Sequence, residues 1–503
     1  MAACNTLWKI NQAEQTRSPP LAYPLKERRA GLLLHPTSLP DSHSGGCLGA
    51  KALRFIDFLT QCGFSVWQTL PLGPTHTGLS PYQCMSVHAG NVELICTDEL
   101  VARGWLEQGE KRSHTALEQA RKGFERHAHE GDRKTFAEFK LQHTAWLDDY
   151  ALFQSIRQAQ GEASWIDWPA PLRDRDASAL LAFRDTQGEA LEQVCFEQFV
   201  FFSQWRAVRD YAHQHGIALF GDLPIFVAHD SADIWAHRDL FSLDATGKPD
   251  VVAGVPPDYF SATGQRWGNP LYRWERIMAD DYRWWLERLR SQLELFDIIR
   301  LDHFRGFEKY WEIPAAAETA IHGRWVAAPG EALFARLQQE FGQLSLVAED
   351  LGVITPEVDA LRARFALPGM KILQFAFSGG ADNPYLPHNH VQQSVVYTGT
   401  HDNDTTLGWY LKCDDVQRRA VNEYLGAPSE RMPWPLIRAA LASVAKLAIL
   451  PMQDILELGS EHRMNTPGTI GNNWNWRFDW EQVPDDLTGR LRQLVRLYGR
   501  TRN

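Results

Sequence analysis

The sequence alternates short apolar runs, each ending in a polar or acidic residue, with longer segments of helical character. This alternation is typical of parallel βαβ units, and eight such units favour an α/β fold of the closed (β/α)8, or TIM-barrel, kind. A chain of 503 residues could otherwise hold about three domains of roughly 150 residues each, but a barrel with insertions absorbs this length. The eight expected strands are 31–35, 65–70, 217–224, 297–302, 344–350, 371–377, 394–400 and 447–454.

The expected strands are unevenly spaced, since long stretches separate the second from the third and the third from the fourth. Such stretches are too long for single barrel helices and must hold insertions. The first is helical in period, as Trp146, Tyr150 and Phe153 show at positions i, i+4 and i+7. We therefore expect one catalytic barrel over residues 1–503, with inserted, mostly helical subdomains at about 74–215 (helical) and about 226–295 (a lid loop and helices).

Charge and composition exclude several classes of protein. Lys and Arg number 51 against 62 Asp and Glu, and the net charge of -11 argues against a nucleic-acid partner. Seven cysteines without a CxxC pair indicate neither a disulfide framework nor a zinc cluster, so we expect reduced thiols and a cytoplasmic protein. Residues 1–20 lack the order of a signal peptide, and no uninterrupted apolar stretch reaches 18 residues, so we expect no membrane partner.

Four carboxylates stand at or just past the ends of expected strands: Asp222, Asp302, Glu349 and Asp402. A single Asp after a strand often only caps the next helix. The strands of a parallel barrel all end on one face, however, so these four should converge there. Two chemistries use converging carboxylates at a barrel mouth, namely a Mg²⁺ site that stabilises an enolate and a glycosidase pair.

The neighbours of these carboxylates favour the glycosidase pair. Arg300 lies two residues before Asp302, so in a strand both side chains share a face, and the guanidinium favours the ionised carboxylate that a nucleophile requires while opposing a divalent metal. Glu349 ends the apolar run 344–348, and partial burial would raise its pKa toward that of a general acid. His303 and His401, beside two of the carboxylates, would supply hydrogen bonds to sugar hydroxyls.

Two further segments carry aromatic residues that fit a sugar site. Residues 255–272 combine Gly and Pro turn residues with Tyr259, Phe260 and Trp267, and the segment is too polar and broken to be a strand or a long helix. We expect an aromatic lid loop there. Tyr82 lies in a turn after the second expected strand, where it is either a sugar contact or a packing anchor.

Ordered motifs along nearly the whole chain resemble the 4-α-glucanotransferases called amylomaltase or disproportionating enzyme, glycoside hydrolase family 77. The matching stretches run from about Arg29 to Asn475. They include RRAGLLLHPTSLP, SVWQTLPLGPT, SPYQ, LFGDLPIFVAHDSADIW, the lid loop, IIRLDHFRGF, VAEDLGVITPEV and YTGTHDNDT.

The resemblance implies a retaining enzyme that acts on maltooligosaccharides and other α-1,4-glucans and needs no cofactor or metal. By the match, Asp302 is the nucleophile, Glu349 the general acid/base, and Asp402 the carboxylate that stabilises the transition state. The match also implies that the following residues contact substrate: Tyr82, Asp222, Tyr259, Phe260, Trp267, Arg300, His303, His401 and Asn473.

Two alternatives to glucan transfer remain at this point. An α-1,4-glucan hydrolase would use the same carboxylates with water as the acceptor. A catalytically silent glucan-binding protein would require a broken carboxylate set, whereas Asp302, Glu349 and Asp402 are all present. The sequence leaves the oligomeric state open.

Overall fold

The centre of the molecule is an eight-stranded parallel sheet with the strand order β10-β11-β12-β1-β2-β3-β6-β9. The computed structural model describes residues 25–41, 45–109, 112–257 and 261–501. Each of the eight expected runs overlaps one of these strands; six strands lie within their runs, whereas the strands at 29–33 and 369–372 each begin two residues earlier. The strands are β1 (Arg29–Leu33), β2 (Val66–Gln68), β3 (Ala218–Leu223), β6 (Ile298–Leu301), β9 (Leu346–Ala348), β10 (Gly369–Ile372), β11 (Ser394–Tyr397) and β12 (Leu447–Pro451).

The two outer strands of this order, β9 and β10, meet and nearly close the sheet into a barrel. The Ala348 N–H donates to the Pro368 carbonyl at 2.8 Å, and the Met370 N–H donates to the Asp350 carboxylate at 2.6 Å. Nearly all strand residues are buried, as expected for parallel strands covered on both faces. The predicted (β/α)8 barrel is confirmed.

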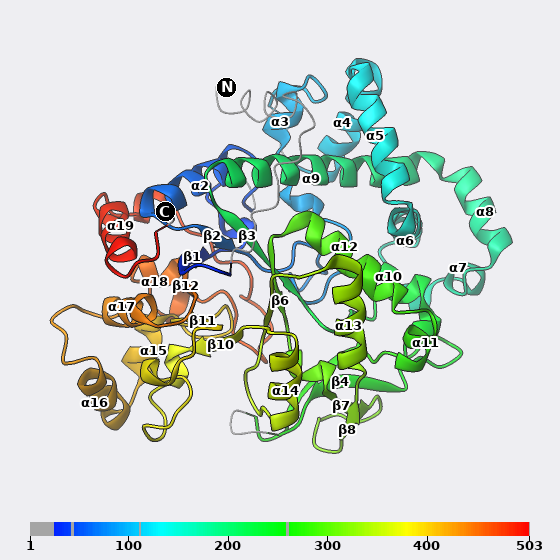
Figure 1. Ribbon diagram of the computed structural model, residues 1–503. Helices are drawn as coiled ribbons and strands as arrows, with labels where there is room; N and C mark the ends of the chain where they lie inside the picture. The colour runs from blue at the N-terminus through cyan, green and yellow to red at the C-terminus, as the bar shows by residue number, and fades with distance from the viewer. Residues whose placement is uncertain (1–24, 42–44, 110–111, 258–260, 502–503) are drawn as a thin grey trace.

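Helices surround the barrel (Figure 1), and one position in the ring departs from the regular pattern. Residues 373–393, which connect β10 to β11 and are all described, contain only the short 3-10 turns η6 (Leu373–Phe375) and η7 (Pro387–Asn389). The other connections contribute the ring helices α2 (Ala50–Cys62), α9 (Gly188–Gln214), α12 (Arg283–Leu295), α13 (Gly330–Phe341), α14 (Pro356–Arg364) and α17 (Trp434–Ala442), with α19 (Leu487–Leu497) after β12. The connection from β11 to β12 also contains α15 (Thr406–Lys412) and α16 (Asp415–Tyr424).

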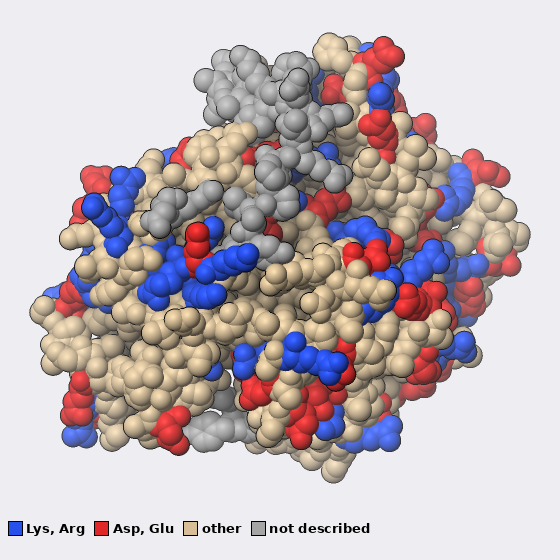
Figure 2. Space-filling view, in the orientation of Figure 1, with Lys and Arg blue, Asp and Glu red and all other residues tan. Residues whose placement is uncertain are grey.

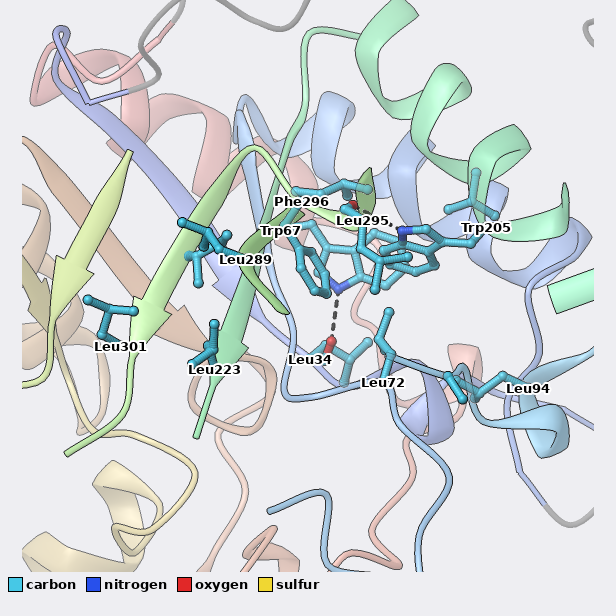
Figure 3. Close-up of a cluster of buried hydrophobic side chains, with 14 of the residues drawn as sticks. Leu34, Trp67, Leu72, Leu94, Trp205, Leu223, Leu289, Leu295, Phe296 and Leu301 are labelled. Carbon is cyan, nitrogen blue, oxygen red and sulfur yellow. Dashed lines mark hydrogen bonds between the residues drawn. The ribbon is translucent and has the colours of Figure 1, made fainter. Parts of the chain in front are cut away.

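The long helix α9 connects the first insertion to the barrel. Figure 1 shows it running across the top of the barrel, with some of the inserted helices above it and others below. Trp205 of α9 lies beside Trp67 of β2, with ring centroids 6.4 Å apart, and both indole N–H groups donate to main-chain carbonyls, those of Leu295 and Leu34 (Figure 3). The other inserted helices are α3 (Thr97–Ala102), α4 (His114–His127), α5 (Glu130–Gln142), α6 (Thr144–Ala159), α7 (Ala170–Arg173) and α8 (Ala177–Thr186).

A four-stranded antiparallel sheet, in the order β5-β4-β7-β8, lies beside the barrel. Two strands precede β6, namely β4 (Val251–Val255) and β5 (Gln265–Pro270), and two follow it, namely β7 (Lys309–Pro314) and β8 (Arg324–Ala327). The expectation that residues 255–272 contain no strand is therefore wrong. β5 forms because β4 supplies its hydrogen-bond partners, and Gly254 permits the approach, since a Cβ there would lie 2.1 Å from the Gln265 carbonyl oxygen.

The expected insertion at 226–295 differs from the observed elements in its extent. Helix α12 packs on β3 as part of the barrel ring, and β7 and β8 extend the inserted structure beyond strand β6. Short helices α10 (Ala232–Ala236) and α11 (Trp274–Ala279) fill the rest of the segment. The division of the chain into subdomains stays a prediction.

Acidic and basic side chains are interspersed over the face shown in Figure 2, with broad uncharged areas between them. Within the described ranges, no helix is both long and apolar enough to cross a membrane.

Candidate active site

The register of the barrel strands brings the predicted carboxylates to one end of the barrel. Asp222 on β3 pairs with Arg300 on β6, and Arg300 pairs with Val347 on β9. Beyond these pairs the Asp302 N–H donates to the Leu223 carbonyl at 3.0 Å, and the Glu349 N–H to the Leu301 carbonyl at 3.1 Å. Asp302 and Glu349 thus follow directly the ends of two hydrogen-bonded strands.

Arg300 connects two of the four carboxylates. Its Nη1 lies 2.8 Å from Asp302 Oδ1 and 2.7 Å from Asp222 Oδ2. Burial lowers the pKa of Arg300, but Asp222 and Asp302 raise it well above the ordinary value, so the guanidinium stays charged. Asp222 itself is 1% exposed and also accepts from the Tyr82 hydroxyl at 2.8 Å. Asp222 therefore lies beneath Arg300 and Tyr82, where it orients both rather than facing the open mouth.

Glu349 has the environment of a carboxyl that protonates near neutral pH. Burial and the charge of Asp302 raise its pKa to about 8, against the opposing effect of Arg300. Its two oxygens accept main-chain N–H groups, Oε2 that of His303 at 2.7 Å and Oε1 that of Leu351 at 2.9 Å. These bonds fix the carboxyl group against the residue that follows Asp302.

Asp402 is held in the opposite, ionised state. Withdrawal from water raises its pKa, but His401 and Asn465 outweigh this effect and hold the pKa well below its usual range. His401 Nε2 lies 3.3 Å from Asp402 Oδ2, and Asn465 Nδ2 donates to Oδ1 at 2.6 Å. The His401 ring is stacked on Tyr82 with centroids 5.2 Å apart, so these contacts fix the position of Asp402.

His303 and Trp267 form one side of the mouth beside Asp302. Burial lowers the pKa of His303 to about 4, so the imidazole is neutral. Its Nε2 is buried and has no hydrogen-bond partner among the residues that the structure describes. The Trp267 ring meets His303 edge-on at 4.9 Å. Tyr259 and Phe260, the other expected lid aromatics, lie outside the described residues.

Asn473 makes its hydrogen bonds within its own loop. Its Oδ1 accepts the Thr466 N–H at 3.0 Å, and its Nδ2 donates to the Thr469 carbonyl at 3.1 Å. The same loop contains two residues that the sequence reasoning missed, Asn465 on the Asp402 carboxylate and Arg463, whose Nη2 donates to the Asp402 carbonyl at 2.8 Å. The only sequence signal there was a Pro-Gly turn, which says nothing about contacts with a distant strand end.

A nearly closed parallel barrel with these carboxylates at its strand ends defines the class, a (β/α)8-barrel enzyme with an acidic mouth. Comparison with known proteins gives the family. The sequence profile of the 4-alpha-glucanotransferases matches residues 34–482, and the chain belongs to that family.

Named relatives match over nearly their whole length. The chain is 49% identical over 490 residues to the 4-alpha-glucanotransferase of Thermus thermophilus, and the aligned region covers 93% of this chain and 98% of that protein. Identity to the enzyme of a Synechocystis strain is 48% over 499 residues, with 95% and 99% covered.

Solved structures agree with this assignment. The amylomaltase from Streptococcus agalactiae in complex with acarbose superposes with a TM-score of 0.91 at 34% identity and covers 95% of this chain and 100% of that chain. The amylomaltase from Corynebacterium glutamicum, at 19% identity and a TM-score of 0.70, shares the fold and covers 95% of this chain and 76% of that chain.

Proposed function

We propose that this 4-α-glucanotransferase works by retention, with Asp302 as the nucleophile and Glu349 as the general acid/base. The observation that carries the proposal is the contrast between the two groups. Asp302 contacts the Arg300 guanidinium at 2.8 Å, whereas the pKa of Glu349 is raised to about 8. A retaining displacement requires one ionised and one protonated carboxyl of this kind.

In the first step, the Asp302 carboxylate attacks the anomeric carbon of the donor glucan. The bond from that carbon to the glycosidic oxygen breaks, and Glu349 gives its proton to the departing oxygen. In the second step, the ionised Glu349 takes the proton from the 4-hydroxyl of an acceptor glucan. The acceptor oxygen attacks the anomeric carbon, the ester to Asp302 breaks, and a new α-1,4 bond forms.

The remaining site residues have supporting roles in this proposal. Asp402, ionised beside His401, stabilises positive charge at the reacting sugar. The neutral His303 and the stacked Tyr82 and His401 contact sugar hydroxyls and ring faces. Trp267, together with Tyr259 and Phe260, covers the acceptor side and limits the access of water. Asp222 acts by orienting Arg300 and Tyr82, and Asn473 by shaping its loop.

Maltooligosaccharides are the proposed substrates, because the site combines carboxylates with aromatic faces. We further propose that the protein acts in the cytoplasm, because the cysteines of the described residues are free thiols, as suits a reducing compartment. The reaction as written needs no metal or cofactor.

The test is chromatography of the products from maltotriose, with Glu349→Gln and an EDTA-treated sample alongside. We expect glucose together with a ladder of longer oligosaccharides and no gain in reducing ends. The ladder should disappear in the variant and persist in EDTA. Shorter sugars alone would identify a hydrolase, and a full ladder from Glu349→Gln would overturn the assignment of the acid/base.

A further inference from the structure

A buried carboxylate that the proposed reaction does not use, Asp454, lies beneath the loop that carries His401 and Asp402. Asp454 is 1% exposed and belongs to the short helix α18 (Met452–Ile455), directly after β12. β12 pairs in parallel with β11. The loop after β11, residues 398–405, leads into helix α15 (Thr406–Lys412), and we call it the β11–α15 loop.

Asp454 holds both ends of this loop. At the first end, Thr398 Oγ1 donates to Asp454 Oδ2 at 2.5 Å. At the other end, the Thr406 N–H donates to Oδ1 at 2.7 Å and Thr406 Oγ1 to Oδ2 at 2.6 Å. Both threonines are fully buried, so water cannot replace the carboxylate as their partner. A single side chain therefore sets the distance between the two ends.

Hydrogen bonds within the loop and to neighbouring segments hold the residues between its two ends. The Thr400 N–H and Oγ1 both donate to Asn403 Oδ1 at 2.8 Å. Gln374 Nε2 donates to the Asp404 carbonyl at 2.8 Å, and the Asp404 side chain accepts from Ser460 Oγ at 2.8 Å. A displacement of Thr398 or Thr406 is thus transmitted to the intervening His401 and Asp402.

We propose that Asp454 is a positioning residue for glucan transfer, acting through the β11–α15 loop to place the Asp402 carboxylate at the reacting sugar. The proposal rests on the proposed function, in which Asp402 stabilises the transition state. A group placed to act on the transition state contributes to kcat more than to substrate binding. Loss of Asp454 should therefore lower kcat and leave KM nearly unchanged.

The first experiment compares Asp454→Ala with Asp297→Ala. Asp297 is the matched control, because its carboxylate is also buried and also accepts hydrogen bonds from the main chain and from a side chain. The donors are the Leu219 N–H at 2.8 Å and His213 Nε2 at 2.9 Å. Asp297 precedes β6, however, and so lies at the other end of the barrel. Both variants should lower the melting temperature. Only Asp454→Ala should lower kcat on maltotriose, by about 10²-fold, the scale of a misplaced catalytic group.

Milder variants keep the test valid if either alanine variant fails to fold. Thr398→Val removes one hydrogen bond to Asp454 with little change in shape and should lower kcat by an intermediate factor. Thr398→Ser retains the hydroxyl group and should therefore have a kcat close to that of the parental enzyme. A parental kcat in both Asp454→Ala and Thr398→Val would overturn the proposal.

A double-mutant cycle separates positioning from general destabilisation. Asp454→Ala is combined with Asp402→Asn, and residual transfer is measured at high enzyme concentration. If Asp454 acts through Asp402, Asp454→Ala should lower kcat only slightly further when Asp402→Asn is already present. A further fall in kcat as large as that caused by Asp454→Ala alone would contradict the proposal. Asp302→Asn is the parallel arm, since parental transfer by that variant would overturn the proposed function itself, whatever Asp454 does.

Discussion

At the scale of single residues, the ionisation of each carboxylate at the barrel mouth follows from the groups around it. Glu349 is withdrawn from water and faces Asp302, so its proton is retained up to a pKa of about 8. Asp402 meets His401 and Asn465, and its pKa falls well below the ordinary range. Carboxyls of the same chemistry thereby suit different roles, as a proton donor and as a fixed negative charge.

The raised pKa of Glu349 predicts the basic limb of the pH profile. The general acid must be protonated for the first step, so kcat/KM on maltotriose should fall as pH rises through about 8. Initial rates between about pH 6 and pH 10 measure this limb. Enzyme returned to neutral pH should regain its activity. A flat profile across this range would show that Glu349 is not the acid in the free enzyme.

Trp267 is predicted to control the competition between water and the acceptor sugar. Its ring meets His303 at 4.9 Å, so Trp267→Ala should open the mouth to water and raise the ratio of hydrolysis to transfer several-fold. Reducing ends and oligosaccharide ladders measured together give the ratio. Trp480→Ala, which removes a tryptophan stacked on Arg54, is the control. An unchanged ratio in Trp267→Ala would contradict the role of the lid.

At the scale of elements, the site depends on segments that come from distant parts of the chain. The loop of residues 463–474 follows β12, yet its Asn465 and Arg463 hold Asp402, which follows β11. Trp474 of the same loop lies against His401, with centroids 5.9 Å apart. The loop is therefore part of the site, although its sequence suggests only a turn.

Two asparagines of this loop should differ in their effects. Asn465→Ala removes a direct 2.6 Å contact to the Asp402 carboxylate and should lower kcat/KM by up to about 10²-fold. Asn473→Ala removes bonds within the loop only and should have a smaller effect. Steady-state kinetics on maltotriose compare the two variants. The reverse order would assign the direct catalytic contact to Asn473 instead.

At the scale of the whole molecule, Arg500 joins the end of the chain to the barrel. It is fully buried and donates to the carbonyls of Leu441, Arg29, Ser443 and Ala445 at 2.6–3.0 Å. These carbonyls belong to β1, to the last turn of α17 and to the segment between α17 and β12. Arg500 therefore connects the segment after α19 to the first barrel strand and to the segment that leads into the last strand, β12.

Arg500→Ala should destabilise the fold without altering the chemistry. Four buried carbonyls would lose a charged donor, at a cost of about 3 kcal/mol. Calorimetric scans at one heating rate should show a lower melting temperature, while kcat well below that temperature stays parental. Arg496→Ala is the control, since Arg496 lies exposed on α19. Equal melting temperatures for the two variants would contradict the anchoring role.

The sequence alone determined the barrel, because the period of its apolar runs is set by local chemistry. It also determined which carboxylates follow strands, and parallel strands must end on one face. The order of motifs gave the family, and the neighbouring residues Arg300 and Asp302 gave a charge pair that the structure contains at 2.8 Å.

Only the tertiary structure decided which residues face the mouth and which support it. Asp222 lies beneath Arg300, strand β5 forms in a segment expected to be a loop, and Asn465 reaches Asp402. Each of these outcomes depends on a hydrogen-bond partner that is distant in sequence. Local patterns report the preference of a segment for an element, whereas the partner of a buried polar group is fixed only when the chain has folded.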